Sequence, residues 1–335
     1  MGWITSFFGM LLNYIFEFVV LVMPAPVATL GISIIVFTII TRLLMTPLQI
    51  MQQRTTKGMA IIQPELTKLQ NKYKDKKDAE SQAKQSAEMQ ALYKKHKINP
   101  LAGCLPLLIQ MPLIIALFGV LRDASTYIVR LQEVYVGLAN SIMGSVSNYQ
   151  QILQPYLDIH SMNGKIKFDL TQVTASNKIL GVKELLSKLT SLQWSELFTQ
   201  IPADAVTNME PLYELKKSYE WFGVNLVDTP NQLVKLGGTG MIIALMVPVL
   251  VWVSTVIYSK YTMAQTQATQ SPKDGNDQQQ KTMNTMNMVL PLMTAFFSYT
   301  MPCGLALYWI AGNLIMLVQQ VVVTKMLDSK SAVSN

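Results

Sequence analysis

Charged residues are scarce in this sequence of 335 residues, where Asp, Glu, Lys and Arg together account for 14%. Half of the residues are hydrophobic, and the mean hydropathy is +0.28. Long apolar segments recur along the chain, and few charges interrupt them. Before any motif is considered, this composition places the chain among the multi-pass membrane proteins.

Cysteine and histidine are also scarce, with two residues of each type. Neither Cys104 nor Cys303 has a histidine or a second cysteine at the spacing of metal ligands. His96 and His160 likewise have no neighbouring residues that would make them metal ligands or catalytic bases. The interiors of the five strong apolar segments hold no His, Asp, Glu or Lys that could activate a serine or threonine. We therefore expect no catalytic residue, no metal ion, no cofactor and no enzyme activity.

The few charges are unevenly placed, and their placement predicts orientation. Residues 51–100 hold eleven Lys and Arg against five Asp and Glu, whereas residues 130–235 hold nine against ten. By the positive-inside rule, the first of these segments is expected in the cytosol. The second is long, and long loops contribute little to that rule.

Arg42 is the most informative residue in the apolar segments. It lies within Val27 to Ile50, a stretch long and apolar enough to cross a bilayer. An arginine at membrane depth costs roughly 2.5–3.5 kcal/mol on insertion scales and about 10–17 kcal/mol in simulations. None of the five strong apolar segments offers an interior Asp or Glu to neutralise it. At about 100° per residue, one helix face holds Thr38, Arg42, Met45 and Gln49.

Two interpretations of Arg42 are open. The side chain could snorkel to the cytosolic headgroups near the end of a tilted helix, although about 12–15 Å of further helix follows it. Alternatively, it could face a water-filled cavity in a helix bundle, open to an anionic group that comes and goes. We favour the cavity, because intramembrane charge is functional by default and because amides that pair across a bundle would not satisfy Arg42.

Prolines and charge runs divide the chain into segments. Pro24 and Pro26 separate the apolar start from the first span, and we prefer an interfacial helix there to a sixth span. A charged run at 72–80 predicts the turn of a helical hairpin. The expected segments are an N-terminal interfacial helix on the outer leaflet (1–25), a first transmembrane helix (26–53), a cytosolic helical hairpin (54–99), a second transmembrane helix (100–129), an extracytoplasmic helical segment (130–238) with helices at 182–198 and 213–222, a third transmembrane helix (239–262), a cytosolic loop (263–284), fourth and fifth transmembrane helices (285–300 and 303–325) and a short cytosolic tail (326–335).

Several stretches resemble the YidC insertase family, which has mitochondrial and plastid relatives. They are the first span with its arginine, the charged hairpin, NPLAGCLPLLIQMP at 99–112, and VLPLMTAFFSYTMPCGLALYWIAGNLIMLVQQ at 289–320. The resemblance covers residues 26–129 and 239–326. It implies an all-α integral membrane protein with a five-transmembrane-helix core, a cytosolic helical hairpin and a hydrophilic groove. That groove would be open to the cytosol and the lipid and closed on the outer side.

The resemblance also implies a function. Members of the family insert and fold membrane proteins without nucleotide hydrolysis, alone or beside the Sec translocon. By motif, Arg42 would be the positive charge of the groove, and Trp309 and Asn313 would be groove residues. Together with the polar helix faces, this gives the expected substrate-binding set: Arg42, Thr38, Gln49, Trp309, Asn313 and Gln320.

The expected partners are nascent membrane proteins with acidic leader regions and the lipid bilayer, with the Sec translocon, the signal recognition particle receptor and the ribosome as further candidates. We expect a functional monomer in a bacterial-type plasma membrane, with its N-terminus outside and its C-terminus in the cytosol. The external segment is longer than the family leads us to expect, and the tail lacks the basic residues by which some relatives bind ribosomes. A polar-cavity solute channel or transporter is the alternative, although such proteins normally show internal repeats, which are not seen here.

Overall fold

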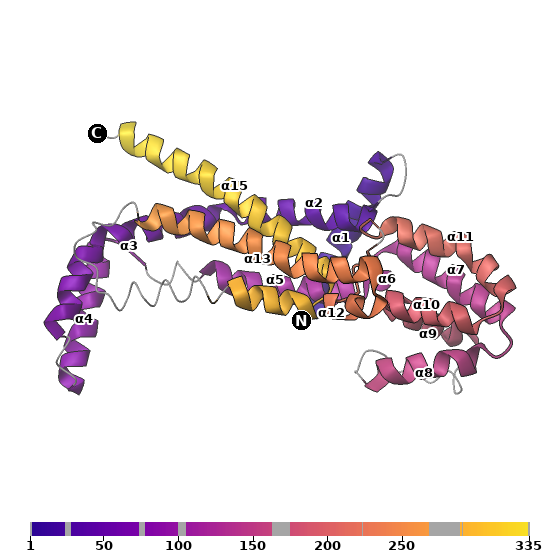
Figure 1. Cartoon of the computed structure of the whole chain (residues 1–335). Coiled ribbons are helices and arrows are strands. Elements are labelled where there is room, and N and C mark those ends of the chain that lie inside the picture. The colour runs from indigo at the N-terminus through magenta and orange to yellow at the C-terminus, as the bar shows by residue number, and fades with distance from the viewer. Residues whose placement is uncertain are drawn as a thin grey trace. The chain divides into compact units, whose positions relative to one another are not determined.

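The computed structural model of the chain describes residues 2–23, 28–73, 78–99, 105–162, 175–222, 224–267, 289 and 291–333. Within these ranges the regular structure is helical, and an isolated bridge between Trp221 and Val224 is its single β-type pairing. The all-helical prediction is confirmed. The helices, drawn in Figure 1, are α1 (Gly2–Val22), α2 (Thr29–Leu44), α3 (Thr46–Tyr73), α4 (Ala79–Lys95), α5 (Leu105–Arg122), α6 (Ala124–Tyr127), α7 (Val129–Ser145), α8 (Tyr149–Met162), α9 (Ala175–Lys188), α10 (Ser191–Gln200), α11 (Ala203–Tyr219), α12 (Pro230–Leu233), η2 (Val234–Leu236), α13 (Gly238–Gln267), residues 291–300 and α15 (Cys303–Val333).

Three of the described helices are long and apolar enough to cross a membrane: Gly2–Val22, Gly238–Ala264 and Cys303–Met326. Thr29–Leu44 and Thr46–Met59 meet the same criterion only as a pair, and Leu108–Arg122 is a shorter apolar helix. The structure therefore holds three candidate spans, or four if the pair is counted as one span. The predicted fourth span (285–300) lies partly outside the described residues, and α1 has the length of a span although we expect it on the outer leaflet.

The first predicted span is bent in the structure. α2 ends at Leu44 and α3 begins at Thr46, and their axes differ by 56°. Pro47 explains the break, because it has no N–H and its ring collides with the carbonyl four residues earlier. As a result Arg42 lies in the last turn of α2, close to a bend, and not in the middle of a regular helix.

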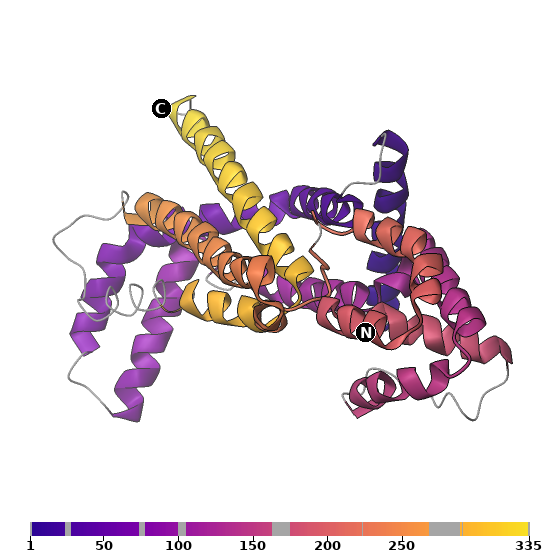
Figure 2. The same cartoon turned by 45° about the vertical axis from the view of Figure 1, so that its right-hand side comes forward.

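The chain divides into two compact units, and helices α2, α5, α13 and α15 each contribute residues to both. The first unit comprises residues 1–38, 114–251 and 295–311, and the second comprises residues 39–113, 252–294 and 312–335. In the first unit, α7 packs against α9 and α11, as both views show (Figures 1 and 2). One face of α7 fills this core because its buried side chains recur every three or four residues. They are Leu131, Val134, Tyr135, Leu138, Ala139 and Ile142.

Two helices of the predicted external segment differ from expectation. The helix predicted at 182–198 is divided between α9 and α10. Thr190 starts the second of them with a capping box: its hydroxyl accepts from the Gln193 backbone N–H at 3.3 Å, and its own N–H donates to the Gln193 side chain at 3.0 Å. The helix predicted at 213–222 is α11, which begins earlier, at Ala203, and ends at Tyr219.

This segment is joined to three of the predicted spans within the first unit. Each junction includes a hydrogen bond near one end of a span. These bonds run from Ala28 N to the Ser218 carbonyl (2.9 Å), from Lys188 Nζ to the Arg122 carbonyl (2.9 Å) and from Cys303 N to the Asp228 carbonyl (2.8 Å). Lys188 also pairs with Asp123. The segment is therefore built onto the ends of α2, α5 and α15.

Asp228 is an ionisable group buried in this segment, with 1% of its surface exposed. Burial raises the pKa of its carboxyl from 3.8 to about 6, even though the carboxylate accepts the Ser191 N–H at 3.1 Å and Lys216 lies nearby. The neighbouring Glu220 raises the pKa further. The folded segment therefore holds this proton more tightly than the unfolded chain does.

A pH dependence of stability follows from Asp228. The pKa of Asp228 is higher in the folded state than in the unfolded chain. Its stabilisation of the fold is therefore fully present below about pH 4 and is lost as the pH rises through about 6. A rise in pKa from 3.8 to about 6 corresponds to a contribution of about 3 kcal/mol to the free energy of unfolding. We expect the segment at 130–238 to resist proteolysis better at pH 5 than at pH 7.5. An Asp228→Asn variant digested at the same two pH values should show a smaller difference. Equal resistance of the two proteins at both pH values would contradict this assignment.

Candidate functional site

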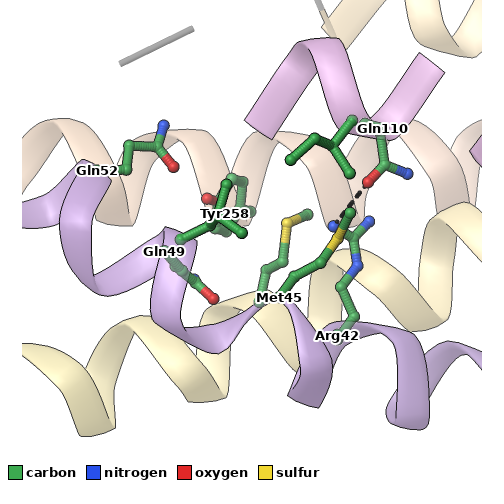
Figure 3. A pocket seen from close by; sticks show the side chains of 9 residues that line it. Arg42, Met45, Gln49, Gln52, Gln110 and Tyr258 are labelled. Atoms are coloured by element: carbon green, nitrogen blue, oxygen red, sulfur yellow. Dashed lines mark hydrogen bonds between the residues drawn. The ribbon is translucent and has the colours of Figure 1, made fainter. Parts of the chain in front are cut away.

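Arg42 lines a pocket in the second unit (Figure 3). The pocket has a volume of about 410 Å³, part of which is open to the surroundings. Its walls come from α2, the bend, α3, α5, α13 and α15. The lining residues are Arg42, Met45, Leu48, Gln49, Gln52, Ile109, Gln110, Tyr258 and Met316.

The guanidinium of Arg42 is held by an amide of α5. Its Nη1 donates to Gln110 Oε1 at 3.0 Å, the bond drawn as a dashed line in Figure 3. Arg42 is largely buried, with 9% of its surface exposed. The expectation that amides of the bundle would not satisfy Arg42 therefore overlooked Gln110. An amide is neutral, however, so this bond satisfies an N–H of the guanidinium without adding a negative charge.

The rest of the pocket is mostly apolar with a few polar groups. Met45, Leu48, Ile109 and Met316 supply the apolar walls. The buried Gln49 Nε2 has no hydrogen-bond partner among the described residues. A buried amide without a protein partner is normally satisfied by water or by a bound molecule. Apolar walls with a few convergent polar groups are typical of binding sites.

The structure brings together only part of the predicted substrate-binding set. Arg42 and Gln49 line one pocket, as their shared helix face suggested. Thr38 belongs to the first unit, is fully buried, and its hydroxyl donates to the carbonyl of Ile34 at 2.6 Å. Trp309 also belongs to the first unit, where it is partly exposed.

The two remaining predicted residues make contacts between helices of the second unit. Asn313 Nδ2 donates to the hydroxyls of Ser254 at 3.1 Å and Thr255 at 2.9 Å, which joins α15 to α13. Gln320 Oε1 accepts a hydrogen bond from Gln53 Nε2, which joins α15 to α3. Neither Asn313 nor Gln320 lines the pocket of Arg42.

Sequence reasoning missed several pocket residues, above all Gln110, Gln52, Tyr258 and Met316. Gln110 gave a usable signal, because it is an isolated amide in an apolar stretch between two prolines. Tyr258 stands one helical turn from Ser254 on a polar face of α13. A single sequence does not show which other helix such a face meets, so these residues could not be assigned to Arg42.

Comparison with known proteins shows to which family the chain belongs. The model of the family described as 60Kd inner membrane protein matches residues 22–330. The membrane protein insertase MisCA of Bacillus subtilis (strain 168) is 28% identical over 289 residues, which cover 86% of this chain and 68% of MisCA. The membrane protein insertase YidC of Oceanobacillus iheyensis is 25% identical over 300 residues, which cover 90% of this chain and 76% of that protein.

Other relatives match a shorter stretch more closely. The membrane protein insertase YidC 1 of Streptococcus pyogenes serotype M1 is 50% identical over 97 residues, or 29% of this chain and 35% of that protein. The apolar helices described above agree with a protein that passes the membrane several times. The chain therefore belongs to the 60Kd inner membrane protein family and is a multi-pass membrane protein related to the membrane protein insertases YidC and MisCA.

Proposed function

We propose that this chain is a membrane protein insertase that inserts and folds membrane proteins without hydrolysing a nucleotide. The observation that carries the proposal is the buried, positively charged Arg42 in a pocket lined by five helices. The names of the related proteins support it. The proposal includes a five-span core whose groove opens to the cytosol and the lipid but not to the outer side.

The pocket would act on the polar part of a substrate. A polar segment crosses more easily where a hydrated pocket shortens the apolar layer. Two opposite charges about 4 Å apart attract by about 4 kcal/mol at an effective dielectric constant near 20, against about 1 kcal/mol in bulk water. Arg42 would therefore draw in an acidic leader region as a transient counter-ion. Gln49 would offer its buried amide to the same segment.

The hydrophobic part of the substrate would supply the driving force. Each CH₂ group moved from water into the bilayer contributes roughly 0.8 kcal/mol, so an apolar segment can drive its own partitioning without a nucleotide. Met45 and Met316 line the pocket, and flexible thioethers adapt to side chains of different shape. Such walls suit a site that accepts many sequences.

The other predicted residues and segments take secondary roles in the proposal. Trp309, Asn313 and Gln320 would meet the substrate away from the pocket of Arg42, whereas Thr38, which is fully buried, would support α2 from within the first unit. The N-terminus would lie outside, with α1 on the outer leaflet, and the C-terminus would lie in the cytosol. The Sec translocon, the signal recognition particle receptor and the ribosome are proposed partners of a protein that functions as a monomer.

Reconstitution tests the proposed function. Proteoliposomes that contain only the purified chain should integrate a single-span substrate with an acidic leader in the absence of any nucleotide. The measurement is the fraction of leader protected from added protease, with protein-free liposomes as the control. Integration no better than in protein-free liposomes would contradict the proposal. Solute flux in the absence of substrate would instead favour the channel or transporter.

The helical pair α3 and α4 is the proposed site of substrate capture. The two helices pack side by side (Figures 1 and 2). Lys72 Nζ of α3 pairs with Glu88 of α4 at 2.8 Å. Deleting residues 54–98 keeps the α3 residues that line the pocket. We expect the deletion to reduce the yield of crosslinks to nascent chains while the external segment stays protease-resistant. An unchanged crosslink yield would count against a role in capture.

A further inference from the structure

The face of α15 that meets Arg42 carries two residues with no role in the site so far. Gly312 lies beside the guanidinium, and Gln319 lies beside the backbone of Arg42. We propose that Gly312 and Gln319 are positioning residues: Gly312 leaves the space that the guanidinium occupies, and Gln319 fixes the bend from which Arg42 projects. This inference rests on the proposed function of the pocket.

Gln319 contacts the bend between α2 and α3 directly. Its Nε2 donates to the Arg42 carbonyl at 2.9 Å and to the Thr46 hydroxyl oxygen at 3.0 Å. The Thr46 hydroxyl itself donates to the same carbonyl at 3.3 Å. The last carbonyls of a helix lack intrahelical donors, so at the end of α2 another group must satisfy them inside a membrane. Gln319 is 8% exposed and supplies that donor from α15.

Gly312 determines how close the guanidinium can come to α15. A Cβ atom built at this position would lie 2.9 Å from Arg42 Nη2 and 3.4 Å from Nε. The atom in the way is the far end of a flexible side chain, so alanine would fit once the guanidinium moved. Gly312→Ala should therefore displace the charge at little cost to the fold.

Both residues belong to one surface of α15. Gly312, Met316 and Gln319 follow at intervals of four and three residues, which places them on one helix face. Met316 lines the pocket, and Gln110 of α5 holds the guanidinium through Nη1. Arg42 is thus fixed at its backbone by Gln319, while Gly312 and Gln110 set the place of its guanidinium.

The test compares Gly312→Ala and Gln319→Leu with two matched controls. Gly144→Ala adds a Cβ to another helical glycine, one with no atom within 4 Å of that Cβ. Asn225→Leu removes a different buried amide bond, the bond from its Nδ2 to the Leu189 carbonyl. Each protein is assayed with two substrates that differ only in an acidic or a neutral leader. The ratio of the two insertion yields is the readout, because a general loss of folding lowers both yields alike.

We expect Gly312→Ala and Gln319→Leu each to lower this ratio about three- to tenfold, because a small displacement of a binding group has a large effect. The controls should keep the wild-type ratio. In an Arg42→Ala background neither variant should change the ratio further, because both act through Arg42. A change that persists in that background, or an unchanged ratio in otherwise wild-type protein, would overturn the inference.

A second readout separates this inference from the proposed function. Phenylglyoxal modifies arginine, and peptide mapping gives the rate at Arg42 relative to that at Arg54. Both variants should change this relative rate at least about twofold, and neither control should. An unchanged rate in Gly312→Ala and Gln319→Leu overturns the positioning role. A changed rate combined with an Arg42→Ala variant that inserts both substrates normally supports the positioning role and instead overturns the proposed function.

Discussion

Replacing Arg42 with alanine should lower the insertion of a substrate with an acidic leader by about 10- to 100-fold. The attraction of about 4 kcal/mol expected near 4 Å is partly offset by the cost of desolvating the carboxylate. A net loss of roughly 1.4–2.8 kcal/mol corresponds to that range. The measurement is the protease-protected fraction in proteoliposomes that contain equal amounts of wild type and variant.

Two comparisons isolate the charge of Arg42 in this experiment. A substrate with a neutral leader should be inserted about equally well by both proteins. Arg42→Lys should retain more activity than Arg42→Ala, because the account requires a positive charge and not the bidentate geometry of a guanidinium. Equal insertion of the acidic substrate by wild type and Arg42→Ala would refute this role for the residue.

Lys216→Met should destabilise the helical segment at 130–238 by about 3–5 kcal/mol. Lys216 and Glu220 form a pair whose side chains are only 3% and 9% exposed. The ammonium of Lys216 also lies 5.7 Å from the ring centre of Trp194 and 5.2 Å from that of Tyr213. Methionine fills a similar volume but leaves Glu220 buried without its counter-ion. Native-state proteolysis of the segment measures this loss, because cleavage follows the population of the open form.

An adjacent exposed pair provides the control for this experiment. Lys217 pairs with Glu214 at 2.7 Å, but their side chains are 43% and 56% exposed. Lys217→Met should change stability by less than about 1 kcal/mol. The double variant Lys216→Met with Glu220→Leu should recover most of the loss, because no unpaired charge then remains buried. If Lys216→Met and Lys217→Met changed stability equally, the claim that the buried pair contributes more than the exposed pair would be contradicted.

Local patterns predicted the helices better than their breaks. α3 ends at Tyr73 and α4 begins at Ala79, on either side of the charged run where the sequence predicts a turn. The bend at Pro47 was not predicted, although the proline is visible in the sequence. A proline is tolerated in the first turn of a helix, so local sequence does not decide between a bend and a continuous span. Gln319, which contacts the bend, lies 273 residues after Thr46 in the sequence, so local sequence does not reveal this contact.

The same limit applies to the pocket. Helical periodicity placed Arg42, Met45 and Gln49 on one face, and all three line the pocket even though the helix breaks between them. Gln110 lies 68 residues from Arg42 in the sequence, and only the packing of α5 brings its amide to the guanidinium. Periodicity within one segment gives the polar face of that segment. It does not give the face of another segment that packs against it.

Site-specific photocrosslinking from Met45, which lines the pocket beside Arg42, tests the central claim most directly. A photoreactive amino acid at this position would be combined with nascent chains in which one aspartate is moved along the leader. We expect crosslinks that follow the position of the aspartate and are lost in an Arg42→Ala background. Crosslinks that do not depend on the aspartate or on Arg42, or their complete absence during active insertion, would contradict the account.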